Sequence, residues 1–124
     1  MRRELSRHRG QEIKRTGDGF LATFDGPARG IRCAVAATEG VRDLGLQIRA
    51  GLHTGEVEIA DGNVRGIAVH IGSRVSGLAA PGEVLVSRTV ADLVAGSGIA
   101  LAERGEHALK GVPGRWLVYA VESI

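Results

Sequence analysis

The strongest constraint on the fold is that strand-like and helical spacings of apolar residues alternate along the chain. Residues 11–16 and 20–24 flank the turn signal Gly17-Asp18-Gly19, and this pattern predicts a β-hairpin. Residues 27–44 and 66–78 space their apolar side chains as amphipathic helices do. The other predicted elements are a helix end at 4–9, strands at 46–52, 56–60, 83–87, 99–102 and 116–121, and a helix at 89–95. From residue 11, the order β-β-α-β-β-α-β-α-β-β predicts an α+β sandwich with helices on a mostly antiparallel sheet.

The composition favours one globular domain with a core of aliphatic side chains. The chain has 124 residues, the size of a single domain or of part of one. Hydrophobic residues make up 44% of it and charged residues 24%, which excludes a disordered chain. Its aromatic residues are two Phe, one Trp and one Tyr. Val, Ile, Leu and Ala must therefore fill the core.

Several classes of protein are excluded by what the sequence lacks. No segment is long and apolar enough to cross a membrane, and the Arg-rich N-terminus has no apolar secretory signal. The lone Cys33 cannot form an internal disulfide, which fits a reducing cytoplasm. The net charge is only +2, although residues 1–15 are basic, and no basic patch with interleaved aromatic residues is present. We therefore expect a cytoplasmic protein with no nucleic-acid partner.

A few polar residues stand where they could do chemistry. Asp18 lies between two glycines at a tight turn, where a carboxylate can bind Mg²⁺ beside substrate phosphates or simply stabilise the turn. His70 and Arg74 share one face of a predicted helix, as a site or as a surface pair. Lys110 lies at the mouth of a loop, where its charge either meets a phosphate or is solvated. It and Lys14 are the lysines of a chain whose other basic residues are all Arg. Three further residues show no spacing typical of a nucleophile or metal cluster, and we expect structural roles for them: Ser87, His53 and His107.

Taken together, five segments resemble the class III adenylate/guanylate cyclase catalytic domain, most closely its actinobacterial members. VHIGSR at 69–74 resembles the family's V-N-x-A-A/S-R helix, and LKG at 109–111 resembles its late L-K-G motif. The others are KRTGDGFLATF at 14–24, RAGLHTGE at 49–56 and PGEVLVS at 81–87. The likeness runs in order from about residue 11 to residue 121. It implies one domain over 1–124, with a ferredoxin-like cyclase core at 11–121 and residues 1–10 as the end of a preceding helix.

The resemblance implies a reaction and a set of site residues. Such enzymes convert ATP or GTP into the 3′,5′-cyclic nucleotide and pyrophosphate, using two Mg²⁺ or Mn²⁺ ions held by two Asp. By matching motifs, Asp18 corresponds to the second metal Asp and Lys14 to the Lys that favours adenine. Lys110 corresponds to the Lys on the terminal phosphates, and Arg74 to the Arg that stabilises the transition state.

The chain departs from the family pattern at two site positions and at its start. His70 stands where most members have an Asn that orients the ribose, and Asn63 stands where an adenine-reading Asp is expected. The F-x-D-I/L strand with the first metal Asp is not found before Asp18. We therefore expect a truncated domain, without the first strand and most of the first helical segment, that is inactive by itself. The alternative is a non-catalytic cyclase-homology module for dimerisation and nucleotide binding.

The resemblance also implies a partner, namely a second copy of the chain. In the family, two protomers pair head to tail and each active site takes residues from both. The expected loss of a central strand would leave unpaired backbone groups, each worth about 1–3 kcal/mol when buried. Open strand edges pair readily with other chains. We therefore expect a homodimer, either strand-exchanged or rearranged around the exposed edges.

Overall fold

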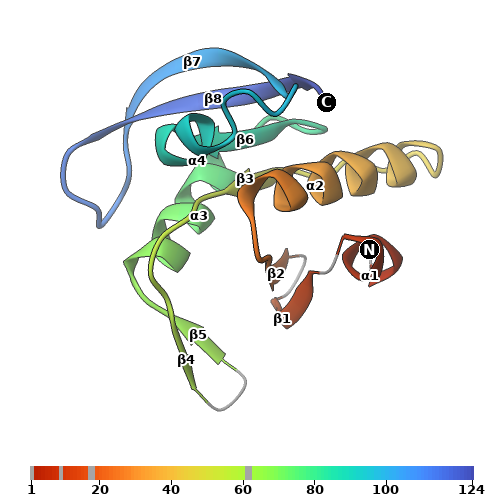
Figure 1. Ribbon diagram of the computed structural model, residues 1–124, viewed down its shortest axis with the longest axis horizontal. Helices are drawn as coiled ribbons and strands as arrows, with labels where there is room; N and C mark the ends of the chain where they lie inside the picture. The colour runs from red at the N-terminus through yellow and green to blue at the C-terminus, as the bar shows by residue number, and fades with distance from the viewer. Residues whose placement is uncertain (1, 9, 17–18, 61–62) are drawn as a thin grey trace.

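The computed structural model describes residues 2–8, 10–16, 19–60 and 63–124. Its N-terminal part is a short helix followed by a two-stranded antiparallel sheet (Figure 1). Helix α1 spans Arg2–Arg7, and strands β1 (Gln11–Thr16) and β2 (Gly19–Thr23) pair from Gln11 with Thr23 to Thr16 with Gly19. The predicted hairpin is thus confirmed, although its turn residues 17–18 lie outside the described residues.

A four-stranded sheet forms the main body, in the order β3-β6-β8-β7. Its strands are β3 (Ala50–Leu52), β6 (Val84–Ser87), β7 (Ala100–Ala108) and β8 (Arg115–Ser123). Strands β3 and β6 are parallel, whereas β8 is antiparallel to both β6 and β7. The mostly antiparallel sheet predicted from the sequence is therefore confirmed.

Helices cover both faces of this sheet. Helix α3 (Ile67–Leu78) packs its buried Ile71 and Val75 with Leu85 of β6. Helices α2 (Pro27–Arg42) and α4 (Arg88–Leu93) contribute Ile31 and Val90 to a second cluster around Val86. Because successive residues of a strand point to opposite faces, Leu85 and Val86 divide the core into these two clusters. All four residues of β6 are buried, as expected for a strand covered on both sides.

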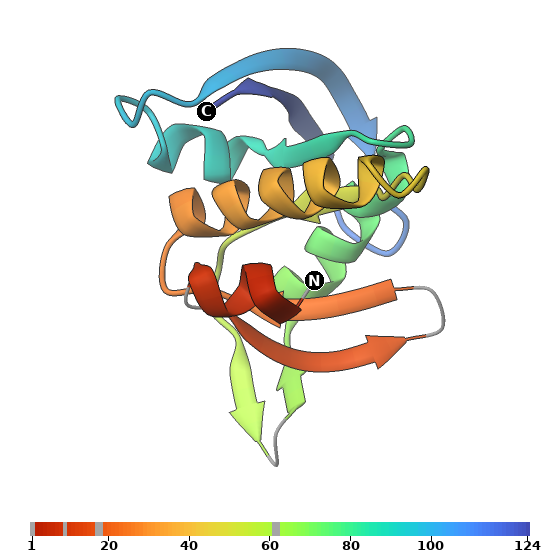
Figure 2. The same cartoon turned by 90° about the vertical axis from the view of Figure 1, so that its right-hand side faces the viewer.

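Helix α2 separates the four-stranded sheet from the N-terminal hairpin in both views (Figures 1 and 2). It begins at Pro27, the predicted start, and Gly26 is its N-cap. Within the described residues the strands form three separate sheets, so β2 and β3 are not paired with each other. The third sheet is an antiparallel arm of β4 (Glu58–Ala60) and β5 (Asn63–Arg65) that projects from the body. No helix among the described residues is long and apolar enough to span a membrane.

Three predicted boundaries were wrong, and in each case the pairing partner explains the difference. Strand β3 begins at Ala50 rather than 46, because its register with β6 starts at Ala50 opposite Val84. Strand β5 was not predicted and begins at Asn63, the last residue of the turn predicted at 61–63, because its three residues pair with β4; residues 61–62 lie outside the described residues. Strand β7 continues six residues past the predicted end at 102, because β8 pairs with it across an irregularity between Glu103 and Glu106.

The apolar face predicted for residues 66–78 is only partly buried. Ile71 and Val75 are buried, but Ile67 is 56% exposed and Leu78 is 39% exposed. These exposed residues lie at the two ends of α3, whereas its middle packs on the sheet.

Candidate functional site

The structure joins two of the sequence-predicted residues by a direct hydrogen bond. Nε2 of His70, on α3, lies 2.8 Å from the backbone oxygen of Lys110, in the loop between β7 and β8. Since a carbonyl oxygen only accepts, the imidazole donates its Nε2–H. Gly111 adopts φ +81°, and a Cβ there would lie 2.9 Å from Nε2 of His70. A glycine at this position therefore lets the loop approach the imidazole closely.

The loop at 109–114 is anchored beneath this bond. Leu109 is 4% exposed and packs in the core cluster with Ile71 and Val75 of α3. The amide of Val112 donates to the oxygen of Leu109 at 2.9 Å and closes a tight turn. The backbone of Lys110 is held by the bond to His70 and by the turn that Leu109 and Val112 close, while Lys110 as a whole residue is exposed to solvent.

Arg74 and Lys110 are both exposed cations with no ion-pair partner in the described part of the chain. Arg74 follows His70 by one helical turn on α3, as the spacing predicts. Two unneutralised cations near one helix–loop junction favour an anionic ligand such as a phosphate.

The remaining sequence-predicted residues are only partly described. Asp18 lies outside the described residues, and so do the side chains of Lys14 and Asn63. The backbones of Lys14 and Asn63 belong to β1 and β5, and these two strands contact each other. The described residues include no group of three or more His, Cys, Asp or Glu side chains that could hold a metal ion. The two-metal centre that the family resemblance implies would include Asp18, which lies outside these residues, so the role of Asp18 stays a prediction.

A second set of polar contacts lies at the end of β3. His53 Nδ1 lies 2.7 Å from the Oγ of Ser87, which is fully buried and also accepts from the amide of Val90 as the N-cap of α4. A buried hydroxyl must donate its proton, so we assign Ser87 as donor to Nδ1 of a neutral imidazole. Burial lowers the pKa of His53, which favours this neutral form. His53 also meets the ring of Trp116 edge to face, with centroids 5.6 Å apart.

Sequence reasoning expected Ser87 and His53 to be structural and assigned no role to Trp116. A Ser immediately before a short helix is a capping signal, and Ser87 does cap α4. The contact of His53 with Ser87 and Trp116 had no local signal, because the three residues are far apart in sequence.

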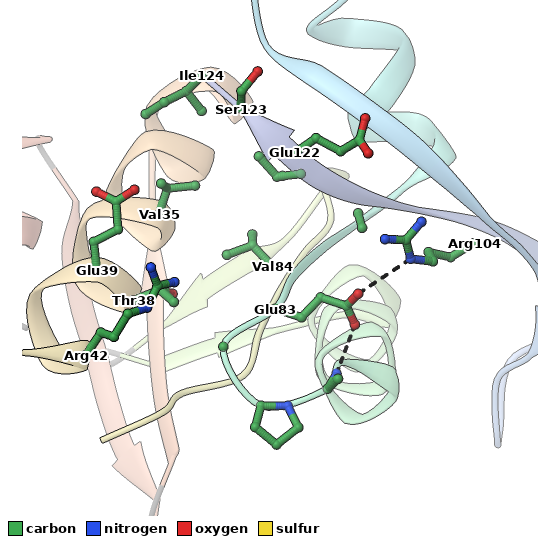
Figure 3. A pocket seen from close by; sticks show the side chains of 15 residues that line it. Val35, Thr38, Glu39, Arg42, Glu83, Val84, Arg104, Glu122, Ser123 and Ile124 are labelled. Carbon is green, nitrogen blue, oxygen red and sulfur yellow. Dashed lines mark hydrogen bonds and ion pairs between the residues drawn. The ribbon is translucent and has the colours of Figure 1, made fainter. Parts of the chain in front are cut away.

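A cavity of about 610 Å³ lies elsewhere, beside the C-terminal half of α2 and the end of β8 (Figure 3). Three of its lining residues contact one another: the carboxylate of Glu83 accepts from the amide of Ala80 at 2.9 Å and pairs with Arg104 at 3.5 Å. None of the site residues whose side chains the structure describes, His70, Arg74 and Lys110, lines this cavity. Its charged groups of both signs give no clear preference for an anion.

Comparison with known proteins defines the class to which this fold and site belong. The sequence model of the "Adenylate and Guanylate cyclase catalytic domain" family matches residues 1–123. "Putative adenylate cyclase 3" of Rhizobium meliloti is 31% identical over 114 residues, which cover 85% of this chain and 19% of that protein. An uncharacterized protein of Mycobacterium tuberculosis is 34% identical over 114 residues, or 88% of this chain and 40% of that protein.

A solved structure agrees with these relatives. The adenylate/guanylate cyclase/hydrolase from Silicibacter pomeroyi superposes with a TM-score of 0.87 at 26% identity, covering 97% of this chain and 75% of that one. The chain therefore belongs to the adenylate and guanylate cyclase catalytic domain family, as its motifs indicated. It spans less than half the length of the two sequence relatives.

Proposed function

We propose that the chain is the part of a nucleotidyl cyclase that binds a nucleoside triphosphate for conversion into the 3′,5′-cyclic nucleotide and pyrophosphate in cyclic-nucleotide signalling. The hydrogen bond between His70 and Lys110 carries this proposal, because it joins the helix motif at 69–74 to the L-K-G motif at 109–111. In the family these two motifs serve the ribose and the terminal phosphates of one nucleotide. Their direct contact supports a single substrate position at this junction. Since nucleoside triphosphates are intracellular compounds, we place the domain in the cytoplasm.

Each residue of the junction has a role that its chemistry allows. The ammonium of Lys110 binds the terminal phosphates, and the guanidinium of Arg74 neutralises charge that develops in the transition state. In the imidazole tautomer that donates Nε2–H to Lys110, Nδ1 is left as a hydrogen-bond acceptor. A ribose hydroxyl can donate a hydrogen bond to Nδ1, and His70 would orient the sugar by accepting it.

We propose ATP rather than GTP as the substrate. The support is the family correspondence of Lys14 with the adenine-favouring Lys, together with the contact between β1 and β5. Lys14 belongs to β1 and Asn63 to β5, so the two residues lie on strands that contact each other. We assign both residues to the base, with Asn63 able to donate as well as accept.

We propose Asp18 as a ligand for Mg²⁺ or Mn²⁺. A divalent cation at that position would neutralise phosphate charge and favour ionisation of the attacking hydroxyl. The protein's own contribution, in the residues described, is to place the triphosphate through Lys110 and Arg74.

We further propose that the chain acts as a homodimer, strand-exchanged or rearranged around its exposed strand edges. The β4–β5 arm projects from the body, and an isolated two-stranded sheet is marginally stable in water. Ile67, 56% exposed, and Val57, 41% exposed, flank the arm with apolar surface. Contact with a second copy would cover this surface.

A second candidate function is a non-catalytic nucleotide-binding module. The two departures from the family's site residues, His70 in place of the ribose-orienting Asn and Asn63 in place of the adenine-reading Asp, favour it. We propose that the 124 residues alone bind ATP without cyclising it, because one family-type metal carboxylate cannot position two cations.

The experiment measures ATP affinity and cyclic nucleotide formation by the purified chain. We expect Lys110→Ala to weaken ATP binding about tenfold, since it removes a charge-assisted hydrogen bond. Arg49→Ala, the matched control, removes an exposed cation before β3 and should leave the affinity unchanged. Equal affinities of both variants and the parent would refute the nucleotide site.

The same preparation tests whether the chain alone is catalytic. With Mg²⁺ or Mn²⁺ and either ATP or GTP, we expect no cyclic nucleotide above background. Cyclic AMP that disappears with Asp18→Ala would show that the chain alone is a working enzyme.

A further inference from the structure

The far end of the Lys110 loop is tied to strand β8 by the single tryptophan of the chain. The indole Nε1–H of Trp116 donates to the backbone oxygen of Pro113 at 3.1 Å. The same indole packs against the core cluster that contains Leu109, where the loop begins. Trp116 therefore holds one end of the loop by a hydrogen bond and packs against the cluster in which the other end is buried.

Trp116 is in turn supported by a chain of contacts that ends in the core. His53 meets the indole at an interplanar angle of 86°, with ring centroids 5.6 Å apart, a favourable edge-to-face arrangement. The imidazole is fixed at Nδ1 by Ser87, whose side chain is fully buried and caps α4. His53, itself held by Ser87, thus helps to fix the orientation of the indole.

The opposite side of the loop is held by α3 through His70 and Lys110. The Lys110 backbone is consequently fixed between a helix and a strand, whereas its ammonium group is free to reach a ligand. A long side chain that starts from a fixed backbone loses less freedom when it binds.

We propose that Trp116, braced by His53, is a positioning residue that holds the 109–114 loop so that Lys110 reaches the terminal phosphates of a bound nucleoside triphosphate. This inference rests on the proposed function. The hydrogen bond from the Trp116 indole to Pro113 is exposed to solvent. An exposed hydrogen bond contributes little to folding stability, so its effect on the loop geometry can be measured separately.

The test is a double-mutant cycle between Trp116→Phe and Lys110→Ala, with dissociation constants measured for ATP and for AMP. Phenylalanine keeps an aromatic ring but cannot donate to Pro113. We expect Trp116→Phe to weaken ATP binding about three- to tenfold, the effect of one hydrogen bond, and to leave AMP binding unchanged. In the Lys110→Ala background, Trp116→Phe should have no further effect on ATP binding.

Tyr119→Phe is the matched control, because it removes a polar group from another aromatic residue of β8 that packs in the other cluster. It should change neither affinity, and thermal unfolding followed by circular dichroism should show that all variants fold. Equal losses for ATP and AMP, or additive losses in the cycle, would overturn the positioning role. If Lys110→Ala weakens ATP binding and Trp116→Phe does not, only the positioning role fails. If Lys110→Ala has no effect, the proposed nucleotide site fails, and the positioning role fails with it.

Discussion

Replacing Gly51 with alanine probes the contact on which the candidate site is built. Gly51 lies in β3, directly beneath α3, the helix that carries His70 and Arg74. A Cβ at this position would lie 2.2 Å from the backbone nitrogen of Ser76 and 2.5 Å from its Cα. Because both atoms belong to the helix backbone, no rotamer change relieves the overlap. The helix must move away from the strand.

The size of the effect follows from what that movement opens. Ordinary contact needs 3.4 Å or more, so α3 must retreat by roughly an ångström. A gap of about 0.5–1 Å already forfeits a quarter to a half of a dispersion contact. Ile71 and Val75, 3% and 0% exposed, would lose packing of this kind. We expect Gly51→Ala to lower the free energy of unfolding by about 3 kcal/mol, the upper part of the range for overpacking.

Urea unfolding, followed by circular dichroism and by the fluorescence of the single tryptophan, measures this change. Gly40→Ala is the control, because Gly40 lies in helix α2 with nothing within 4 Å of its added Cβ. Alanine there should raise the free energy of unfolding by about 0.5–1 kcal/mol. If the free energy of unfolding of Gly51→Ala lies within about 0.5 kcal/mol of the parent's, α3 does not lie against β3 as described.

Three further predictions concern the polar contacts of the site. Ser87→Ala should lower the free energy of unfolding by about 2 kcal/mol in urea titrations, because it removes a helix cap and the partner of His53. Gly111→Ala should weaken ATP binding more than Gly114→Ala in calorimetric titrations: both residues have positive φ, but only the first Cβ would displace His70. Burial lowers the pKa of His53 below its ordinary value of 6.5, so the unfolded chain takes up the proton first as the pH falls. The free energy of unfolding should therefore decrease below about pH 6.5 in urea titrations, and His53→Gln should reduce that dependence.

The elements that local signals specify were predicted from the sequence. Helix α2 begins at the Gly-Pro pair at 26–27, and β6 matches the short apolar run predicted as a buried strand at 83–87. Strands whose bounds are set by a pairing partner were misjudged. The three residues 63–65 become β5 only because β4 pairs with them, and the length of β7 is set by β8.

The candidate site could be predicted only through the family resemblance. Spacing alone places His70 and Arg74 on one helix face, but it cannot bring Lys110 to His70 across 40 residues of chain. The same limit applies to His53 and Trp116, whose contact arises from the order of strands in the sheet. Contacts of this kind are set by tertiary packing rather than by local propensity.

The most direct test of the nucleotide site is a crystal structure of the chain with a non-hydrolysable ATP analogue and Mn²⁺. We predict that the terminal phosphates lie within hydrogen-bond distance of the Lys110 ammonium and that the ribose faces Nδ1 of His70. An analogue bound instead in the cavity beside Arg42 and Arg104, with the 109–114 loop empty, would contradict the account.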